Sequence, residues 1–337
     1  MVSTWKIKGR GMYGDDRIIS SKYFISKNCV SCGWGSPVTK HKEYIKDFQT
    51  YKEKWLEMYG EDRKWGYQGV HHLFESVKKG DFLWTRLNGE YYVAQVPEDP
   101  ITLFHIDYSD EALQHDSTVQ LKNIKWLKCG TEDTVPGSIS SFTSNRNSIV
   151  KVDKGETIQD GYTATSIFSA KILNPNFDLP IKDKRMVFNF IGPSGFEDII
   201  ALWLYDRFNY VVIPSTNKKS TQTYEFVLVD GSKVENRYQS SRRVYLQAKN
   251  GENDLFFKNY TNLLQNDIDE VWLVTSRGNI YGLSGEKEKN QIVRYKKTSE
   301  KYEAISFDLK LLIDFIFDTT KNSILPESIK VLTKLFK

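Results

Sequence analysis

The stretch VYLQAKNG at residues 244–251 carries a glutamine and a lysine two positions apart on an expected β-strand. Side chains at positions i and i+2 of a strand point to the same face, so Gln247 and Lys249 lie side by side. Such a pair is ordinary on the wet face of an edge strand. The same pair can also form half of a metal-dependent nuclease site, in which an amide oxygen binds Mg²⁺ and the ammonium orients a water molecule.

The preceding strand, YEFVLVD, helps to decide between an ordinary solvated pair and a nuclease site. It is expected to form an antiparallel hairpin with RRVYLQAK, with Asp230 facing Arg242 at the end near the loop. Counting back along both strands places Glu225 opposite Gln247. A carboxylate, an amide oxygen and a lysine then meet at one end of the hairpin, where the two oxygens can bind Mg²⁺.

The elements that position this hairpin follow a recognisable order. SGFEDIIALWLYDRF has the pattern of an amphipathic helix, and NYVVIPS, TYEFVLVD, RRVYLQAK and EVWLVTS are strands. KNYTNLLQND and FDLKLLIDFIFDTTK are expected to be helices. This order predicts an α/β sandwich around a central mixed sheet.

Helix, acid, hairpin and Q-x-K in this order resemble the Mrr-like branch of the PD-(D/E)xK restriction-endonuclease fold, over roughly residues 190–280. That branch often has glutamine in place of the second acid. The resemblance implies catalytic roles for Glu197, Glu225, Gln247 and Lys249, and Mg²⁺ as the cofactor, bound by Glu197, Glu225 and Gln247. The chain departs from the family pattern because no Pro-Asp pair precedes the strand. The alternative for Glu197 is an ordinary acid in the first helical turn, favoured by the helix dipole.

The first part of the chain mixes strands and helices. RIISSKYFISKNCVSCGW looks like strand material, and apolar residues recur every three or four positions between residues 36 and 59, which predicts one helix there. DFLWTRLNGEYYVAQV predicts a hairpin around Asn88 and Gly89. With LFHIDY and VQLKNIKWLK as further strands, we expect a small, partly open β-barrel with a helix or two.

VSCGWGS, VKKGDFLWTRLNGEYYVAQV and VQLKNIKWLK together resemble the PUA-like fold of the EVE and YTH type, over about residues 15–150. In that family an aromatic-walled pocket holds a flipped, often modified base. The resemblance implies such a pocket, with Trp34 and Trp84 as its first candidate walls and Trp65 and Tyr91 behind them. Aromatic walls restore the stacking that a flipped base loses. The alternative for any one of these aromatic residues is a place in the core.

Composition, charge and cysteine content limit the kinds of protein that the chain can be. With 337 residues and 39% hydrophobic content, the chain is expected to form two folded domains, residues 1–170 and 171–337. The net charge of +4 permits polyanion binding without requiring it.

Cys29 and Cys32 have the spacing of a zinc knuckle, yet Cys129 and five scattered histidines are the only further cysteine or histidine ligands for a zinc ion. No run of about 18 apolar residues occurs, so neither a membrane partner nor a membrane span is expected. The odd number of cysteines fits a reducing compartment, and we expect a cytoplasmic location.

The two resemblances together imply a modification-dependent, type IV-like DNA restriction endonuclease. Its first domain would read a modified base in double-stranded DNA, and its second would hydrolyse phosphodiester bonds with Mg²⁺. A homodimer is expected, since one Q-x-K site cuts one strand. Two alternatives stay open: a non-catalytic nucleic-acid-binding protein with a degenerate nuclease fold, and a nuclease gated by a small nucleotide bound in the first domain.

Overall fold

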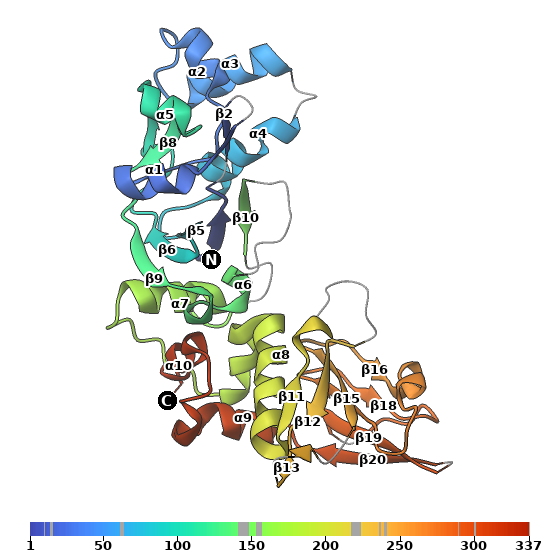
Figure 1. The fold of residues 1–337 in the computed structure, drawn as a ribbon. Helices are drawn as coiled ribbons and strands as arrows, with labels where there is room; N and C mark the ends of the chain where they lie inside the picture. Colours follow the sequence, from blue (N-terminus) through green and yellow to red (C-terminus); the bar gives the residue numbers. More distant parts are fainter. Residues whose placement is uncertain are drawn as a thin grey trace. The chain divides into compact units, whose positions relative to one another are not determined.

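A computed structural model describes most of the chain: residues 1–9, 11–13, 16–60, 64–140, 148–152, 157–216, 224–235, 237–238, 241–288, 290–299 and 301–336. The chain divides into two compact units, Met1–Leu179 and Pro180–Lys337 (Figure 1). The boundary expected after residue 170 falls inside helix α7 (Ala164–Leu173), which belongs wholly to the first unit. Each unit combines helices with a sheet of parallel and antiparallel strands, which confirms the general expectation that the chain mixes helices and strands in an α+β or α/β fold.

Two separate sheets form the frame of the first unit. The larger has the strand order β10-β1-β5-β6-β9 and the smaller β4-β8-β7, and among the described residues no barrel closes. The described strands thus form two open sheets, and the partly open, PUA-like barrel expected for this unit stays a prediction. The strands of the larger sheet are β1 (Thr4–Ile7), β5 (Phe82–Leu87), β6 (Glu90–Gln95), β9 (Leu127–Gly130) and β10 (Ile149–Lys151). Those of the smaller are β4 (Cys29–Ser31), β7 (Phe104–Ile106) and β8 (Val119–Lys122), and β2 (Gly11–Tyr13) pairs with β3 (Asp16–Ile18).

The predicted hairpin around Asn88 and Gly89 is confirmed. These two residues link β5 to β6 and have φ angles of 51° and 85°. A two-residue turn with both φ angles positive matches the twist of antiparallel strands, and Asn-Gly adopts it at low cost.

The helices of the first unit differ from the expected pattern at two places. Residues 20–27 form a helix rather than a strand, and the single helix expected over residues 36–59 is two helices. Asp47 begins the second of them, because its carboxylate accepts from the Thr50 N–H in a capping box. The helices are α1 (Ser20–Lys27), α2 (Ser36–His41), α3 (Phe48–Tyr59), α4 (Lys64–His71), α5 (Asp110–Gln114), α6 (Gly137–Ser140) and α7.

A six-stranded mixed sheet with the order β11-β12-β15-β17-β19-β20 forms the centre of the second unit. Only β15 and β17 pair in parallel within it. Its strands are β11 (Tyr210–Val212), β12 (Phe226–Asp230), β15 (Arg243–Lys249), β17 (Glu270–Thr275), β19 (Ile292–Thr298) and β20 (Lys301–Phe307). Two short pairs accompany it: β13 (Lys233–Val234) with β14 (Arg237–Tyr238), and β16 (Leu255–Phe256) with β18 (Ile280–Tyr281).

Both faces of this sheet are covered. Helix α8 (Val187–Phe208) packs on one face, where the Trp203 ring lies 5.9 Å from that of Trp272, and α9 (Lys310–Phe317) and α10 (Glu327–Thr333) pack beside α8 (Figure 1). Gly192, at φ 68°, breaks α8 near its start. On the other face the segment between β15 and β17 forms a small core with Leu273 and Val293. This segment has short 3-10 turns, Phe257–Asn259 and Thr261–Leu263, where a helix was expected.

Neither α8 nor any other helix in the described part of the chain is long and apolar enough to span a bilayer.

Candidate functional site

Glu225, Gln247 and Lys249 meet at one end of the hairpin formed by β12 and β15. Phe226 pairs with Leu246, and the Glu225 N–H donates to the Leu246 carbonyl over 2.8 Å, so Glu225 lies opposite Gln247. This is the register expected from the sequence. Because side chains alternate between faces along β15, Gln247 and Lys249 both project on the side away from α8.

The three side chains bind one another directly. The Gln247 Nε2 donates to Glu225 Oε1 over 2.9 Å, and the Lys249 Nζ donates to the same oxygen over 2.8 Å. Gln247 is buried, whereas the side chains of Glu225 and Lys249 are 24% and 41% exposed to solvent. A ligand can therefore reach the carboxylate and the ammonium from solvent.

Tyr260 is a neighbour of this cluster that the sequence did not indicate. It lies in the segment between β15 and β17 and is almost fully buried. Burial, and secondarily the charge of Glu225, raise the pKa of its hydroxyl. Tyr260 therefore stays protonated beside the cluster and can only donate a hydrogen bond or accept one as a neutral group.

Glu197 lies on α8, which contacts β15 from the opposite face of the sheet. Its side chain is half-buried. The hydrogen bonds within the cluster come from Glu225, Gln247 and Lys249, and the role of Glu197 as a further metal ligand stays a prediction. Asn250, directly after Lys249, donates from Nδ2 to the Phe188 carbonyl over 2.7 Å and so ties this end of β15 to α8.

The cluster suits Mg²⁺ by the chemistry of its donors. Within the described residues, no three His, Cys, Asp or Glu side chains gather closely enough to hold a metal ion. Glu225 would supply a carboxylate oxygen, and Gln247 an amide oxygen after its amide turns about the last bond. Mg²⁺ commonly takes one or two carboxylates and completes its shell with water and phosphate oxygens, so two protein ligands fit this ion.

In the first unit, Trp34 is the predicted pocket residue that the structure leaves accessible. Its side chain is 37% exposed, and its ring packs edge-on against Trp55 at 5.9 Å and Tyr59 at 6.0 Å. Trp34 also has a φ of 66°, which is rare for a bulky residue, and its carbonyl accepts from the Tyr51 hydroxyl over 2.9 Å. Such strained backbone is concentrated at functional sites.

The other predicted pocket residues are placed differently. Trp84 and Tyr91 are completely buried, so neither presents a face to a ligand, and both are core residues. The Trp84 Nε1 donates to Ser169 Oγ over 2.9 Å, and its ring stacks on Phe168 of α7. Trp65 belongs to α4, and its side chain lies outside the described part of the structure.

Asp116 is a further polar group at the Trp34 loop, and no sequence pattern indicated it. A Cβ on Gly33 would lie 2.5 Å from its Oδ2, so the carboxyl group packs directly against the residue before Trp34. Burial raises the pKa of the Asp116 carboxyl to about 6. A carboxyl beside an aromatic surface can accept from the amino group of a base, as aspartate does with cytosine.

The environment of Cys29 and Cys32 keeps their thiols protonated and inaccessible. Cys29 and Cys32 are both buried, and burial raises the pKa of both thiols, that of Cys29 to about 12. Buried protonated thiols are weak nucleophiles and weak metal ligands.

In comparisons with known proteins, the chain matches no protein-family model, no curated protein sequence and no solved structure. The candidate sites therefore depend on the geometry above.

Proposed function

We propose that the chain is a Mg²⁺-dependent endonuclease that cuts double-stranded DNA carrying a modified base. The observation that carries this proposal is the convergence of Glu225, Gln247 and Lys249, within hydrogen-bond distance, at an accessible end of two inner strands of the mixed sheet. The alternative expected from the sequence, a solvated lysine on an edge strand, does not apply, because β15 is paired on both sides, with β12 and with β17.

The residues of the cluster have separable roles in this proposal. Glu225 and Gln247 would hold the metal ion, which when bound would offset the negative charge on the phosphate. Lys249, which neutralises Glu225 in the structure, turns toward the attacking water or the phosphate and orients it by hydrogen bonding. Tyr260 stays neutral beside the Glu225 carboxylate.

The first unit would supply the base reader. Trp34 offers an accessible aromatic face supported from behind by Trp55 and Tyr59, and Asp116 adds a hydrogen-bonding group at the same loop. An extruded base needs both a stacking surface and a polar partner for its edge.

Lys249→Ala tests whether the Glu225–Gln247–Lys249 cluster is the nuclease active site. With plasmids that are unmodified, methylated or hydroxymethylated, we expect the wild type to cut one modified form with Mg²⁺ and to lose this activity with EDTA. Lys249→Ala should cut at least about a hundredfold more slowly, the size seen on removal of one charge-stabilising donor, while binding of the same plasmid persists.

Lys301→Ala is the matched control, because Lys301 is an exposed lysine at the opposite end of the same sheet. It should cut like the wild type. Cleavage by Lys249→Ala at the rate of this control would show that the cluster is not the active site.

A further inference from the structure

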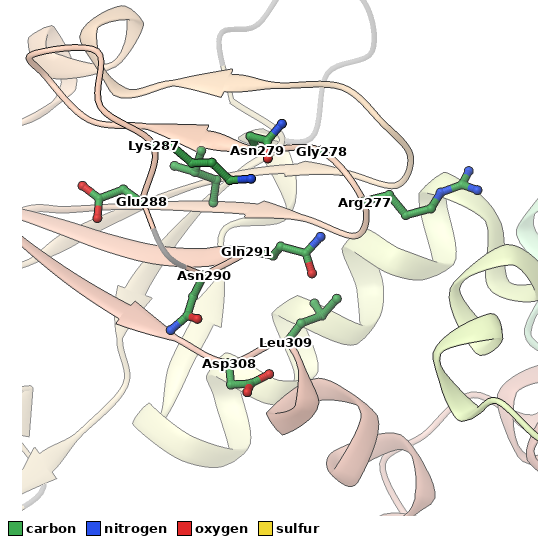
Figure 2. A pocket seen from close by; sticks show the side chains of 10 residues that line it. Arg277, Gly278, Asn279, Lys287, Glu288, Asn290, Gln291, Asp308 and Leu309 are labelled. Atoms are coloured by element: carbon green, nitrogen blue, oxygen red, sulfur yellow. The ribbon is translucent and has the colours of Figure 1, made fainter.

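Figure 2 shows a polar pocket of about 300 Å³ in the second unit. Strand pairing places its residue Gln291 at the same end of the central sheet as Lys249. Lys249 pairs with Thr275, and the Thr275 N–H donates to the Gln291 carbonyl over 2.9 Å. Gln291 directly precedes β19 and Asp308 directly follows β20, next to the paired residues Ile292 and Phe307. Lys249, Thr275, Gln291 and Asp308 form one row across four neighbouring strands. Gln291 and Asp308 line the pocket, and their side chains lie on the same face of the sheet as that of Lys249.

The wall of the pocket is tied to the loop that follows Lys249. The Ser276 N–H donates to the Lys249 carbonyl over 3.1 Å, and Gln291 Nε2 donates to the Ser276 carbonyl over 2.9 Å. The Arg277 N–H donates to the Gly251 carbonyl over 3.1 Å. The pocket is thus held in a fixed position relative to the Glu225–Gln247–Lys249 cluster.

The lining of the pocket has an unusual chemistry. It carries two cations, Arg277 and Lys287, two acids and three amides, whereas most ligand pockets are largely apolar. The charges cancel, so the pocket does not suit a bare phosphate alone. The amides of Asn279, Asn290 and Gln291 can each donate and accept hydrogen bonds, as the edge of a base requires.

The distance between the two sites suits one strand of nucleic acid. Two strand spacings separate Lys249 from Gln291, which is about 10 Å at the usual distance between neighbouring strands. Phosphates along one strand of a duplex follow each other at about 3.4 Å of helix rise. A strand with its scissile phosphate at Lys249 therefore reaches the pocket within a few nucleotides.

We propose that this pocket is a subsite for a nucleotide of the cleaved strand, close to the scissile phosphate. Arg277 and Lys287 bind the phosphate oxygens of this nucleotide, and Asn290 binds the edge of its base. This inference rests on the proposed nuclease function. It adds that the second unit reads DNA sequence beside the cut, independently of the modified base.

The test measures binding of a short fluorescein-labelled DNA duplex of mixed sequence to the full chain, with Lys249→Ala present in every variant to prevent cutting. Adding Arg277→Ala and Lys287→Ala should weaken binding about tenfold or more. It should also reduce the slope of log affinity against log salt by about 2, one for each lost phosphate contact. Adding Arg243→Ala and Lys301→Ala, which removes two exposed cations at the far end of the sheet, should change neither quantity appreciably.

Asn290→Ala, in the otherwise wild-type chain, tests base reading. Cleavage of a library randomised beside the modified base should lose its preference at one position near the cut. Equal binding by the Arg277/Lys287 and Arg243/Lys301 variants, each in the Lys249→Ala background, would overturn the subsite, as would an unchanged cleavage preference of Asn290→Ala. If the wild type cuts no duplex while only the Arg277/Lys287 variant loses binding, the nuclease assignment fails and the nucleotide subsite stands.

Discussion

Trp34 gives the most direct test of base recognition at the level of one residue. Its ring is partly accessible and packs edge-on against Trp55 and Tyr59, so its removal should cost a stacking surface and less stability than removal of a fully buried tryptophan. We expect Trp34→Ala to lose about 1–3 kcal/mol of affinity for modified DNA, which is about tenfold to more than a hundredfold. Competition binding against unmodified duplex at one salt concentration measures the loss of discrimination.

Trp84→Ala is the control for this experiment. Trp84 is fully buried on Phe168, so truncation should cost about 3–5 kcal/mol of stability, as for other buried aromatic residues. Its melting temperature should fall, and all activities should fall together. A large fall in melting temperature for Trp34→Ala with unchanged discrimination would mean that Trp34 is structural as well.

Asp116 predicts a pH dependence of stability. Burial raises the pKa of its carboxyl to about 6 in the folded chain, above the value of about 3.9 expected when unfolded. The folded state therefore binds this proton more tightly, so its contribution to stability is greatest below about pH 4 and is lost as the pH rises through 6. Asp116→Asn should be more stable than the wild type by roughly 1–3 kcal/mol at pH 7.5 and by much less at pH 4.5. Urea unfolding at the two pH values measures this difference, and an equal gain at both would contradict the assignment.

At the scale of elements, the sequence predicted the turns, the hairpin register and the helix whose form depends on residues close together in the chain. The Asn88–Gly89 turn follows from two residues that accept positive φ, and the hairpin register follows from counting along two strands. This register brought Glu225 beside Gln247. The long helix before the hairpin was predicted equally well, because its apolar residues recur at helical spacing over many turns.

Features that depend on distant packing were not predicted. Trp84 lies on a strand whose two faces are both covered, so its position on the strand could not show whether it was exposed. The segment between β15 and β17 contains helix-forming residues, yet it forms 3-10 turns because Phe257 and Tyr260 must reach the sheet core. Asp116 meets Gly33 across 83 positions of the chain, which no local pattern records.

Glu270 predicts a stability effect at the end of the sheet away from the candidate site. Its side chain is fully buried, and its carboxylate lies 3.4–3.8 Å from Arg242, Arg294 and Lys296. Tyr210 also donates to it over 3.1 Å. Glu270→Gln keeps the shape but leaves the three cations without their central negative charge, so we expect a loss of about 3–5 kcal/mol in the free energy of unfolding.

Glu303→Gln is the matched control, because Glu303 is exposed and pairs with Lys296 across neighbouring strands. Its effect should stay within about 0.5 kcal/mol, as for most exposed charges. Urea unfolding of both variants compares them, and similar midpoints would show that the Glu270 network adds no net stability.

At the scale of the whole molecule, the two candidate sites belong to different compact units. The accessible aromatic loop lies within Met1–Leu179, and the Glu225–Gln247–Lys249 cluster lies within Pro180–Lys337. Each unit has its own buried core. Recognition and cutting should therefore be separable by dividing the chain.

A fragment of residues 1–179 tests this separation. Ending at Leu179 keeps α7 whole, with Phe168 and Ser169 in place against Trp84. We expect this fragment to bind a duplex with the modified base more tightly than the same duplex without it, and to cut neither. Fluorescence competition at matched salt measures the two affinities. Equal affinities would rule out base reading by this unit, since phosphate contacts do not distinguish bases. Cutting by the fragment would place the nuclease chemistry outside the Glu225–Gln247–Lys249 cluster.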